Sequence, residues 1–229
     1  MRVESEHENH IDTLEWSTSV PSMFPSLHCR GSSEVNPCLG LSPELLNIIS
    51  AISNVSRRRC FQEQNTSQDF AALRSRLTSL KSTHSSEIDK DDLMSLHSAA
   101  FEDATWIYLY HAINGQPADS DIIQQTHLPS LMKTLSRIHR IHGNLLAFLP
   151  YPMWALFIAS CVVLEHDRVQ ILEWFTILKR NKPVSNVPST MAAVEAIWKR
   201  EDLECDQPRR SSPIWTAAIS RLGWKMPFT

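Results

Sequence analysis

The sequence contains little glycine. It has five glycines among 229 residues, about a third of the ordinary frequency of about 7%. Glycine is the residue that most readily adopts the positive φ of tight hairpin turns and phosphate-cradling loops. The chain also lacks a dinucleotide-binding glycine fingerprint, a P-loop, a Gly-x-Ser-x-Gly nucleophile elbow, an alternating strand pattern and an internal repeat. These absences favour an all-helical protein.

The sequence also lacks a Cys-x-x-Cys pair that would indicate a structural zinc site. The five cysteines are Cys29, Cys38, Cys60, Cys161 and Cys205. Their odd number and wide spacing indicate reduced intracellular thiols. The first twelve residues are acidic and rich in histidine, whereas a secretory signal needs a basic start and an apolar run. We therefore expect the glycosylation sequons at Asn54 and Asn65 to stay unmodified.

No uninterrupted apolar run is long enough to cross a membrane. A spanning helix needs about 20 apolar residues. Residues 145–164 have that length, but Pro150 and Pro152 stand inside the run and forbid one continuous helix. From Met153 only about a dozen residues pass before the charged residues that begin at Glu165. The segment is therefore predicted to be a buried core helix.

Charge of one sign is not in excess. The net charge is −3, and the hydrophobic fraction of 42% is sufficient for a globular core. A chain with this balance has no overall electrostatic reason to bind nucleic acid or an anionic membrane. Any such binding would require a local patch.

Apolar residues at helical spacing predict about seven to eight helices in an irregular all-α bundle or array. Residues 1–39 are predicted to be a disordered or partly docked lead-in, and residues 40–229 a helical domain. Ser42 is expected to cap the first helix, with Pro43 at its first position. The predicted helices begin at Pro43, near Phe70, near Asp91, at Ser120, near Met153 with a continuation to Leu178, near Ser189, and at Ile214.

Two histidine patterns raise the question of a metal site. The segment "HENH" at 7–10 resembles half of a zinc-protease motif but lacks its i, i+4 histidine spacing. In "RIHRIHG", His139 and His142 lie three residues apart on one helical face. Together with Glu165, His166 or Asp167 from a neighbouring helix, they could bind a metal ion. The alternative is that both histidines line the polar edge of an amphipathic helix, and this interpretation is preferred.

Two clusters of charge have simpler structural explanations. Asp89, Asp91 and Asp92 resemble an aspartate-rich magnesium motif, but they precede a predicted helix, where carboxylates favour the positive end of the dipole. Helix capping is the preferred interpretation. Residues 57–59 are three arginines expected to follow the first helix, at its negative end. A nuclear-import or phosphate-binding role for them stays a weaker alternative.

Tryptophan is plentiful, with seven residues spread along the chain: Trp16, Trp106, Trp154, Trp174, Trp198, Trp215 and Trp224. Indole rings either fill a helical core or line a ligand cavity between helices. Core packing is the preferred interpretation. A cavity is retained as the alternative because a regulatory helical domain would use one.

Several segments, taken in order, resemble the fungal-specific transcription factor domain of zinc-cluster regulators. They are "GLSPELLNIISAISNVSR", "LHSAAFEDATWIYLYHAI", "LPYPMWALFIASCVVLEHDRVQILEWF", "MAAVEAIWKRED" and "IWTAAISRLGWKMPFT", and they cover roughly 40–229. The most specific parts are Pro150 or Pro152 with Trp154, Phe157 and Ala159, and the later Val-Glu-x-x-Trp at 194–198.

The resemblance implies an all-helical, nuclear regulatory region that lies C-terminal to a zinc cluster held by six cysteines. It also implies regulatory, dimer-forming or effector-sensing duties. This sequence has no six-cysteine cluster, no basic linker after one and no coiled-coil heptads, and we expect it to begin inside the domain. DNA binding and zinc ligation are therefore not carried over, and the family has no catalytic residues to transfer.

The expected function is that of a non-enzymatic, nuclear transcription regulator without its own DNA-binding cluster. No residue is assigned a catalytic, cofactor-binding, metal-binding or DNA-binding role, and no cofactor or membrane is expected. The expected partners are transcription regulators or coactivators, in a homodimer or heterodimer formed through the apolar stripes at 123–141 and 169–178, with a small-molecule effector as a further option. The alternatives are a small helical enzyme or ligand-binding protein on the same scaffold, and an unstable fragment with uncovered apolar faces.

Overall fold

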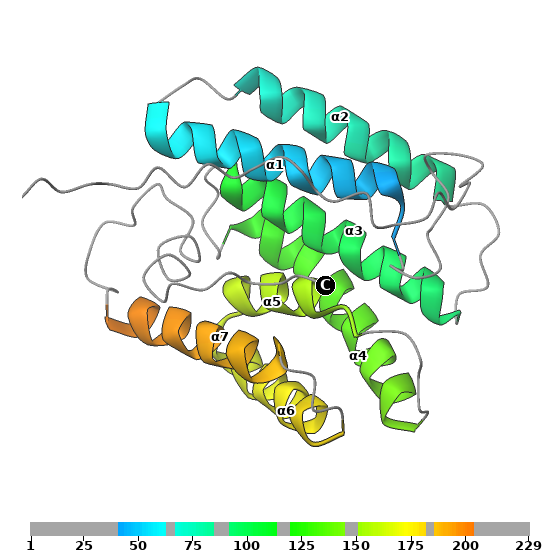
Figure 1. The fold of residues 1–229 in the computed structure, drawn as a ribbon, viewed down its shortest axis with the longest axis vertical. Coiled ribbons are helices and arrows are strands. Elements are labelled where there is room, and N and C mark those ends of the chain that lie inside the picture. The colour runs from blue at the N-terminus through cyan, green and yellow to red at the C-terminus, as the bar shows by residue number, and fades with distance from the viewer. Residues whose placement is uncertain are drawn as a thin grey trace, which may run out of the picture.

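The computed structural model describes residues 41–62, 67–84, 92–113, 120–144, 151–181 and 186–203. These residues form seven α-helices and one π-helical turn, and no β-strand occurs among them. Figure 1 shows α1, α2 and α3 in one half of the molecule and α4 to α7 in the other. The all-α prediction is therefore confirmed. The lead-in at 1–39 and the helix expected at Ile214 lie outside the described residues.

Helices α1 (Pro43–Gln62) and α2 (Ser67–His84) form an antiparallel pair, side by side in Figure 1. The Ser42 hydroxyl oxygen accepts a hydrogen bond from the Leu45 amide at 3.2 Å, which confirms the predicted cap. The pair is joined by a buried apolar seam: Leu45, Ile48, Ile52 and Val55 from α1, and Leu73, Leu77 and Leu80 from α2.

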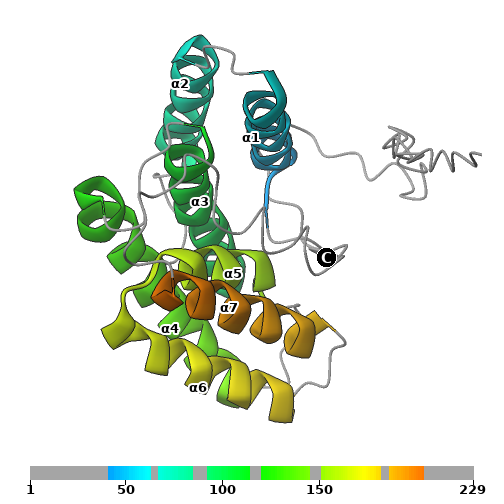
Figure 2. The same cartoon turned by 90° about the vertical axis from the view of Figure 1, so that its left-hand side faces the viewer.

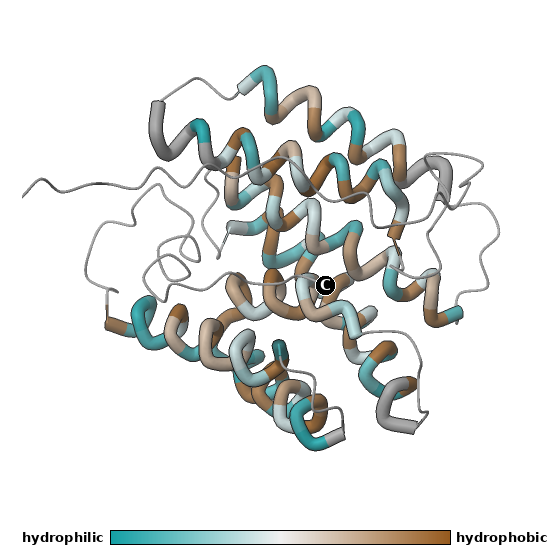
Figure 3. Tube along the Cα trace, in the orientation of Figure 1, coloured by the Kyte–Doolittle hydropathy of each residue, from teal (hydrophilic) through white to brown (hydrophobic). Residues whose placement is uncertain are grey.

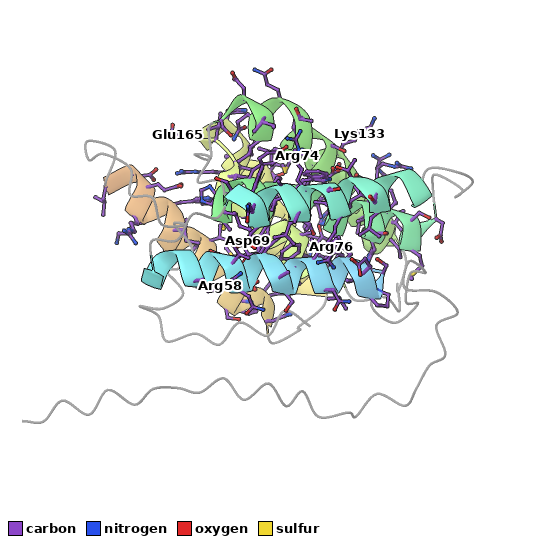
Figure 4. The ribbon with its side chains drawn as sticks, turned by 90° about the horizontal axis from the view of Figure 1, so that it is seen from above. Arg58, Asp69, Arg74, Arg76, Lys133 and Glu165 are labelled. Carbon is purple, nitrogen blue, oxygen red and sulfur yellow. The ribbon has the colours of Figure 1, made fainter. Side chains whose placement is uncertain are left out.

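Ion pairs join α1 and α2 near both ends of this seam. Arg76 donates to the Glu44 carboxylate at 2.6 Å, and Arg58 lies 3.5 Å from the Asp69 carboxylate. Asp69 and Arg76 lie on the side of α2 that faces α1 (Figure 4). Because these side chains are partly exposed to solvent, each pair contributes little to stability and mainly favours the antiparallel orientation.

Helix α3 (Leu93–Ala112) contacts α1, α2, η1, α4 and α5. The Asp92 carboxylate accepts hydrogen bonds from the Ser95 amide at 3.2 Å and the Ser95 hydroxyl at 3.3 Å. Capping by Asp92 is therefore confirmed, whereas Asp89 and Asp91 lie outside the described residues. Most of α3 after Ala100 is buried, as a central helix requires.

The π-helical turn η1 (Ile123–His127) leads directly into α4 (Leu128–Asn144). The predicted start at Ser120 is confirmed, because its carbonyl accepts from the Gln124 amide at 2.9 Å. The sequence did not indicate the π-helical turn. Most of the apolar stripe at 123–141 is buried: Ile123, Leu128, Leu131, Leu135 and Ile138 are each 3% exposed or less, and Ile141 is half-buried. The stripe packs into the core of this chain, and the expected pairing with another protein stays a prediction.

Helix α5 (Met153–Val162) is the most enclosed element, and every residue from Trp154 to Val162 is buried. The chain leaves the helix at Val163 and begins α6 (Glu165–Asn181) two residues later, where the sequence had predicted a continuation. Val163 has an extended conformation, and Glu165 and Asp167 lie in the first turn of α6, where carboxylates favour the helix dipole. No helix in the described part of the chain is long and apolar enough to span a membrane.

Helix α7 (Asn186–Leu203) packs against both α5 and α6, and Figure 2 shows it between them. It begins at Asn186, three residues before the predicted start. Ser189 does not cap it, because the Ser189 hydroxyl donates to the Asn186 carbonyl at 3.0 Å. The second apolar stripe is split: Phe175 and Leu178 are buried, while Val169 is 63% exposed.

The core is continuous through both halves of the molecule. In Figure 3, hydrophobic and hydrophilic residues alternate along α1 and α2, as expected for helices with one buried face. Helix α5 has no exposed face in this sense, because α3, α4 and α7 all pack against it and its residues from Trp154 to Val162 are buried.

Candidate functional site at the end of helix α5

The proline-tryptophan motif forms the beginning and body of α5. Pro152 immediately precedes the helix, and Trp154 lies in its first turn. The Trp154 ring stacks on Phe101 of α3 at 5.8 Å with 8° between the planes, and meets Tyr108 edge-on at 5.9 Å. Phe157 and Ala159 are buried. The motif therefore fixes α5 against α3 by aromatic packing.

Tyr108 links this aromatic group to α1. Its hydroxyl lies 3.1 Å from the hydroxyl of Ser53, close enough for a hydrogen bond. Burial raises the pKa of Tyr108, and the hydrogen bond with Ser53 opposes that shift. The phenol therefore stays neutral and connects α1, α3 and α5 as a structural contact.

The second motif, at 194–198, meets the first. Trp198 is 6% exposed, and its indole N–H donates to the Ser160 backbone carbonyl at 2.8 Å. The last carbonyls of a helix have no partner within the helix. Trp198 therefore satisfies a buried carbonyl at the end of α5 from 38 positions away in the chain. The Ser160 hydroxyl itself donates to the Leu156 carbonyl at 2.7 Å.

A second side chain satisfies the same helix end. The Gln124 amide, in η1, donates to the Val162 backbone carbonyl at 2.7 Å. A π-helical turn rotates the residues that follow it relative to a regular α-helix, and such turns often mark functional positions. Here the turn contains the glutamine that caps α5. Gln124 and Trp198 thus fasten one helix end to two other elements.

Arg168 secures Trp198 from its outer side. The guanidinium lies 5.2 Å from the centre of the Trp198 ring and donates to Asp202 at 2.8 Å and Glu201 at 3.1 Å. Its side chain is only 17% exposed. Stacking and charge-assisted hydrogen bonds together hold the beginning of α6 to the end of α7.

Cys161 lies inside this assembly and is fully enclosed. Burial raises its thiol pKa well above the ordinary value, and the Glu201 carboxylate raises it further. The thiolate is the reactive form of cysteine. The Cys161 side chain is therefore an inert part of the core.

The sequence did not reveal the cluster around His127. The His127 ring stacks on Trp106 at 5.4 Å, and its Nδ1 lies 3.8 Å from the Asp103 carboxylate, too far for a hydrogen bond. Both side chains are 11% exposed. Tyr110 lies 5.9 Å from the same ring, and the three α3 residues share a face by their spacing of three and four. This cluster packs η1 against α3.

Of the two histidines considered as metal ligands, the structure describes the side chain of His139, which contacts aromatic rings. The His139 ring stacks on Trp174 of α6 at 5.8 Å and meets Tyr151 edge-on at 6.3 Å, while burial lowers its pKa. His166 is 73% exposed and pairs with its neighbour Asp167 at 3.2 Å. Among the described residues, no group of three potential ligands could hold a metal ion. The side chain of His142 and the "HENH" segment lie outside them.

The three consecutive arginines lie inside the last turns of α1, because this helix continues to Gln62 and does not end before them. Arg58 pairs with Asp69, as described above. The side chains of Arg57 and Arg59 lie outside the described residues. The Arg58–Asp69 ion pair is a structural contact between α1 and α2.

The four described tryptophans fill the core. Trp106, Trp154, Trp174 and Trp198 are each 7% exposed or less. An open hollow of about 420 Å³ lies elsewhere, along α2, and is lined by Phe70, Ala71, Arg74, Ser75, Thr78 and Ser79. No tryptophan lines that hollow. Trp16, Trp215 and Trp224 lie outside the described residues.

Comparison with known families gives one match. The family model described as the fungal specific transcription factor domain matches residues 5–229, almost the whole chain. The matched range includes both motifs that meet at the end of α5. No curated protein and no solved structure matches the chain.

Proposed function

Since this chain belongs to the fungal specific transcription factor domain family, we propose that it regulates transcription through protein contact, without a DNA-binding cluster of its own. The family supports a role in transcription regulation and nuclear function. The observation that carries the proposal is the site at α5. Its polar groups, from Gln124 to Trp198 and Arg168, are engaged in joining helices. These contacts fix how α5, α6 and α7 pack, so the polar groups of the site support the fold and leave protein contact to the exposed surface.

The proposal extends to what the domain does not do: we propose that it has no enzymatic activity. The His127 ring stacks on Trp106, and its Nδ1 lies 3.8 Å from the Asp103 carboxylate, with both side chains largely buried. His139, the best metal-ligand candidate, is occupied by ring contacts with Trp174 and Tyr151. These placements favour a structural role for each group.

The partners proposed are transcription regulators or coactivators in the nucleus. Contact must use surface that the fold leaves exposed, because the α4 stripe is buried in the core. The test is affinity purification of the tagged full chain from nuclear extract, with the recovered proteins identified by mass spectrometry. The expected result is enrichment of transcription regulators over a tag-only control. Recovery of none would contradict the proposal.

Effector sensing is a second candidate function, favoured by one observation. The open hollow along α2 is lined by the Phe70 ring, the Arg74 cation and three hydroxyl-bearing residues, of which Thr78 and Ser79 donate to backbone carbonyls of α2. The Phe70 ring lies 5.7 Å from Tyr110, so an occupant would touch the aromatic cluster behind it. Thermal-shift screening of a metabolite panel tests this function. Arg74→Ala should abolish any stabilisation found, and a panel without a stabilising compound would contradict it.

A further inference from the structure

One serine of helix α2 follows two arginines at a distinctive spacing. In "RSRLTS", Arg74 and Arg76 stand five and three residues before Ser79. No other serine or threonine of the sequence has arginine at both of these positions. Protein kinases select their acceptor hydroxyl partly by such charge patterns, because acidic groups in the substrate groove contact the basic side chains. The spacing therefore indicates an acceptor for a kinase that selects basic segments.

The Ser79 hydroxyl lies at the surface and has room beside it. Ser79 is exposed, and its hydroxyl donates to the Ser75 carbonyl at 3.0 Å, within the same helix. It also lines the open hollow of about 420 Å³ along α2. Figure 1 shows α2 at the outer edge of the molecule, packed on α1 and α3. A phosphate group on Ser79 would therefore extend away from the core.

A kinase can read this pattern only when the end of α2 opens. Arg74 lies on the side of α2 away from α1, whereas Arg76 faces α1 (Figure 4). In an extended chain, residues two apart point to the same side, so both arginines then face one groove. Opening must break the hydrogen bond of 2.6 Å from Arg76 to Glu44 and expose Leu77. Local opening of one helix at the edge of a fold costs less than global unfolding.

We propose that Ser79 is a phosphorylation site and that its phosphate weakens the contact between Arg76 and Glu44. In the transfer, the Ser79 Oγ attacks the γ-phosphorus of ATP and an O–P bond forms. The bond from that phosphorus to the β,γ-bridging oxygen breaks, ADP leaves, and a base of the kinase takes the hydroxyl proton. This inference goes beyond the proposed function, because it holds whether or not the chain contacts a regulator.

The spacing of the residues explains the effect of the phosphate. Ser79 follows Arg76 by three residues, so the two side chains are neighbours on the helix surface. A phosphoserine has a charge of about −1.5 to −2 and three acceptor oxygens. It therefore competes with the Glu44 carboxylate for the Arg76 guanidinium and also repels that carboxylate. Both effects weaken the attachment of α2 to α1.

The test incubates the purified full chain with ATP and a purified serine kinase that selects arginine at these two positions. Mass spectrometry locates the phosphate, and a synthetic peptide of residues 72–82 confirms that the kinase is active. Thr176 of α6 is the matched control within the same chain. It is exposed and its hydroxyl donates to the Leu172 carbonyl at 2.8 Å, but no arginine stands among the five residues before it.

Two variants break the same ion pair and separate recognition from opening. Arg76→Gln removes an arginine of the pattern, whereas Glu44→Gln releases Arg76 and keeps the pattern. The expected result is phosphate on Ser79, formed about tenfold or more slowly in Arg76→Gln and not more slowly in Glu44→Gln. Circular dichroism confirms that both variants are folded. No phosphate on Ser79, transfer to Thr176 at a comparable rate, or equal rates in the two variants would overturn the proposal.

Hydrogen exchange of the α2 amides measures the effect on the ion pair. After phosphorylation, these amides should exchange about twofold to fivefold faster, since an exposed pair contributes up to about 1 kcal/mol. The increase should be smaller in Glu44→Gln, where the pair is already broken. Unchanged exchange in the phosphorylated chain, or an equal increase in Glu44→Gln, would overturn the proposed effect on Arg76.

Discussion

The indole N–H of Trp198 and the backbone carbonyl of Ser160 form a buried hydrogen bond of 2.8 Å. Through it, the motif at 194–198 closes the end of the helix formed by the motif at 150–159. Two segments that give the chain its family resemblance therefore serve one structural purpose. They hold α7 against the end of α5, and the surface that these helices present to a partner depends on that packing.

Trp198→Phe is expected to lower the free energy of unfolding by about 1–3 kcal/mol more than Trp106→Phe. Both indoles are almost equally buried, but the Trp106 N–H has no hydrogen-bond partner in the described structure, whereas that of Trp198 does. The first change leaves the Ser160 carbonyl unsatisfied, and the second removes an unsatisfied donor. Urea unfolding of the two variants checks this difference, and equal losses would refute it.

Gln124→Ala is expected to cost about 1–2 kcal/mol of stability, because it leaves the Val162 carbonyl without the Gln124 hydrogen bond. Its neighbour supplies a matched control. Gln125 is exposed and donates only to Asp121 at 3.0 Å, one turn away, so Gln125→Ala should change stability by less than about 0.5 kcal/mol. Thermal unfolding of the two variants measures the stability loss of each. A reversed order would show that the π-helical turn does not hold α5.

Arg168→Lys is expected to destabilise the chain by about 1–2 kcal/mol, even though the charge is kept. A lysine cannot reach Glu201 and Asp202 together while stacking on Trp198, as the planar guanidinium does. Asp202 is 54% exposed, so water screens that pair and Asp202→Asn should cost less than Glu201→Gln. Denaturant titration measures all three variants. Full stability in Arg168→Lys would rule out the bridging role.

The stability of the chain should fall as the pH drops below 6.5. Burial lowers the folded-state pKa of His139 from its ordinary value of 6.5, so between the two values the unfolded chain binds more protons. The free energy of unfolding therefore increases with pH in that window and loses the His139 contribution below it. His139→Phe keeps a ring against Trp174 and should flatten this slope, whereas His166→Gln, at an exposed site, should not. Urea unfolding between about pH 5 and about pH 8 measures the slopes.

The sequence indicated most helices because their apolar residues recur on one face. The stripe from Leu45 to Val55 and the Ser42 cap determine α1 locally, and the structure contains both. The break between α5 and α6 was missed because Val163 and Leu164 prolong an apolar run, so the periodicity gives no signal there. The π-helical turn was missed although its extra residue leaves a signal. Ile123 and Leu128 are both buried and lie five residues apart, whereas a regular α-helix spaces the residues of its buried face three or four apart.

The contacts of the site were beyond sequence reasoning. The tryptophans were expected to pack in the core, and the four described ones do. That Trp198 reaches Ser160, or that Gln124 reaches Val162, depends on helices that meet only after folding. Likewise, His139 and His142 share a helical face by their spacing. Whether His139 meets a carboxylate or an aromatic ring depends on α6, which places Trp174 there.

The central claim is that this folded domain regulates transcription through protein contact. The most direct measurement tethers the full chain, through fusion to an unrelated DNA-binding domain, upstream of a reporter gene in fungal cells. We predict that reporter output changes relative to the DNA-binding domain alone, at an equal protein level. An output equal to that of the DNA-binding domain alone, with the fusion folded and nuclear, would contradict the account.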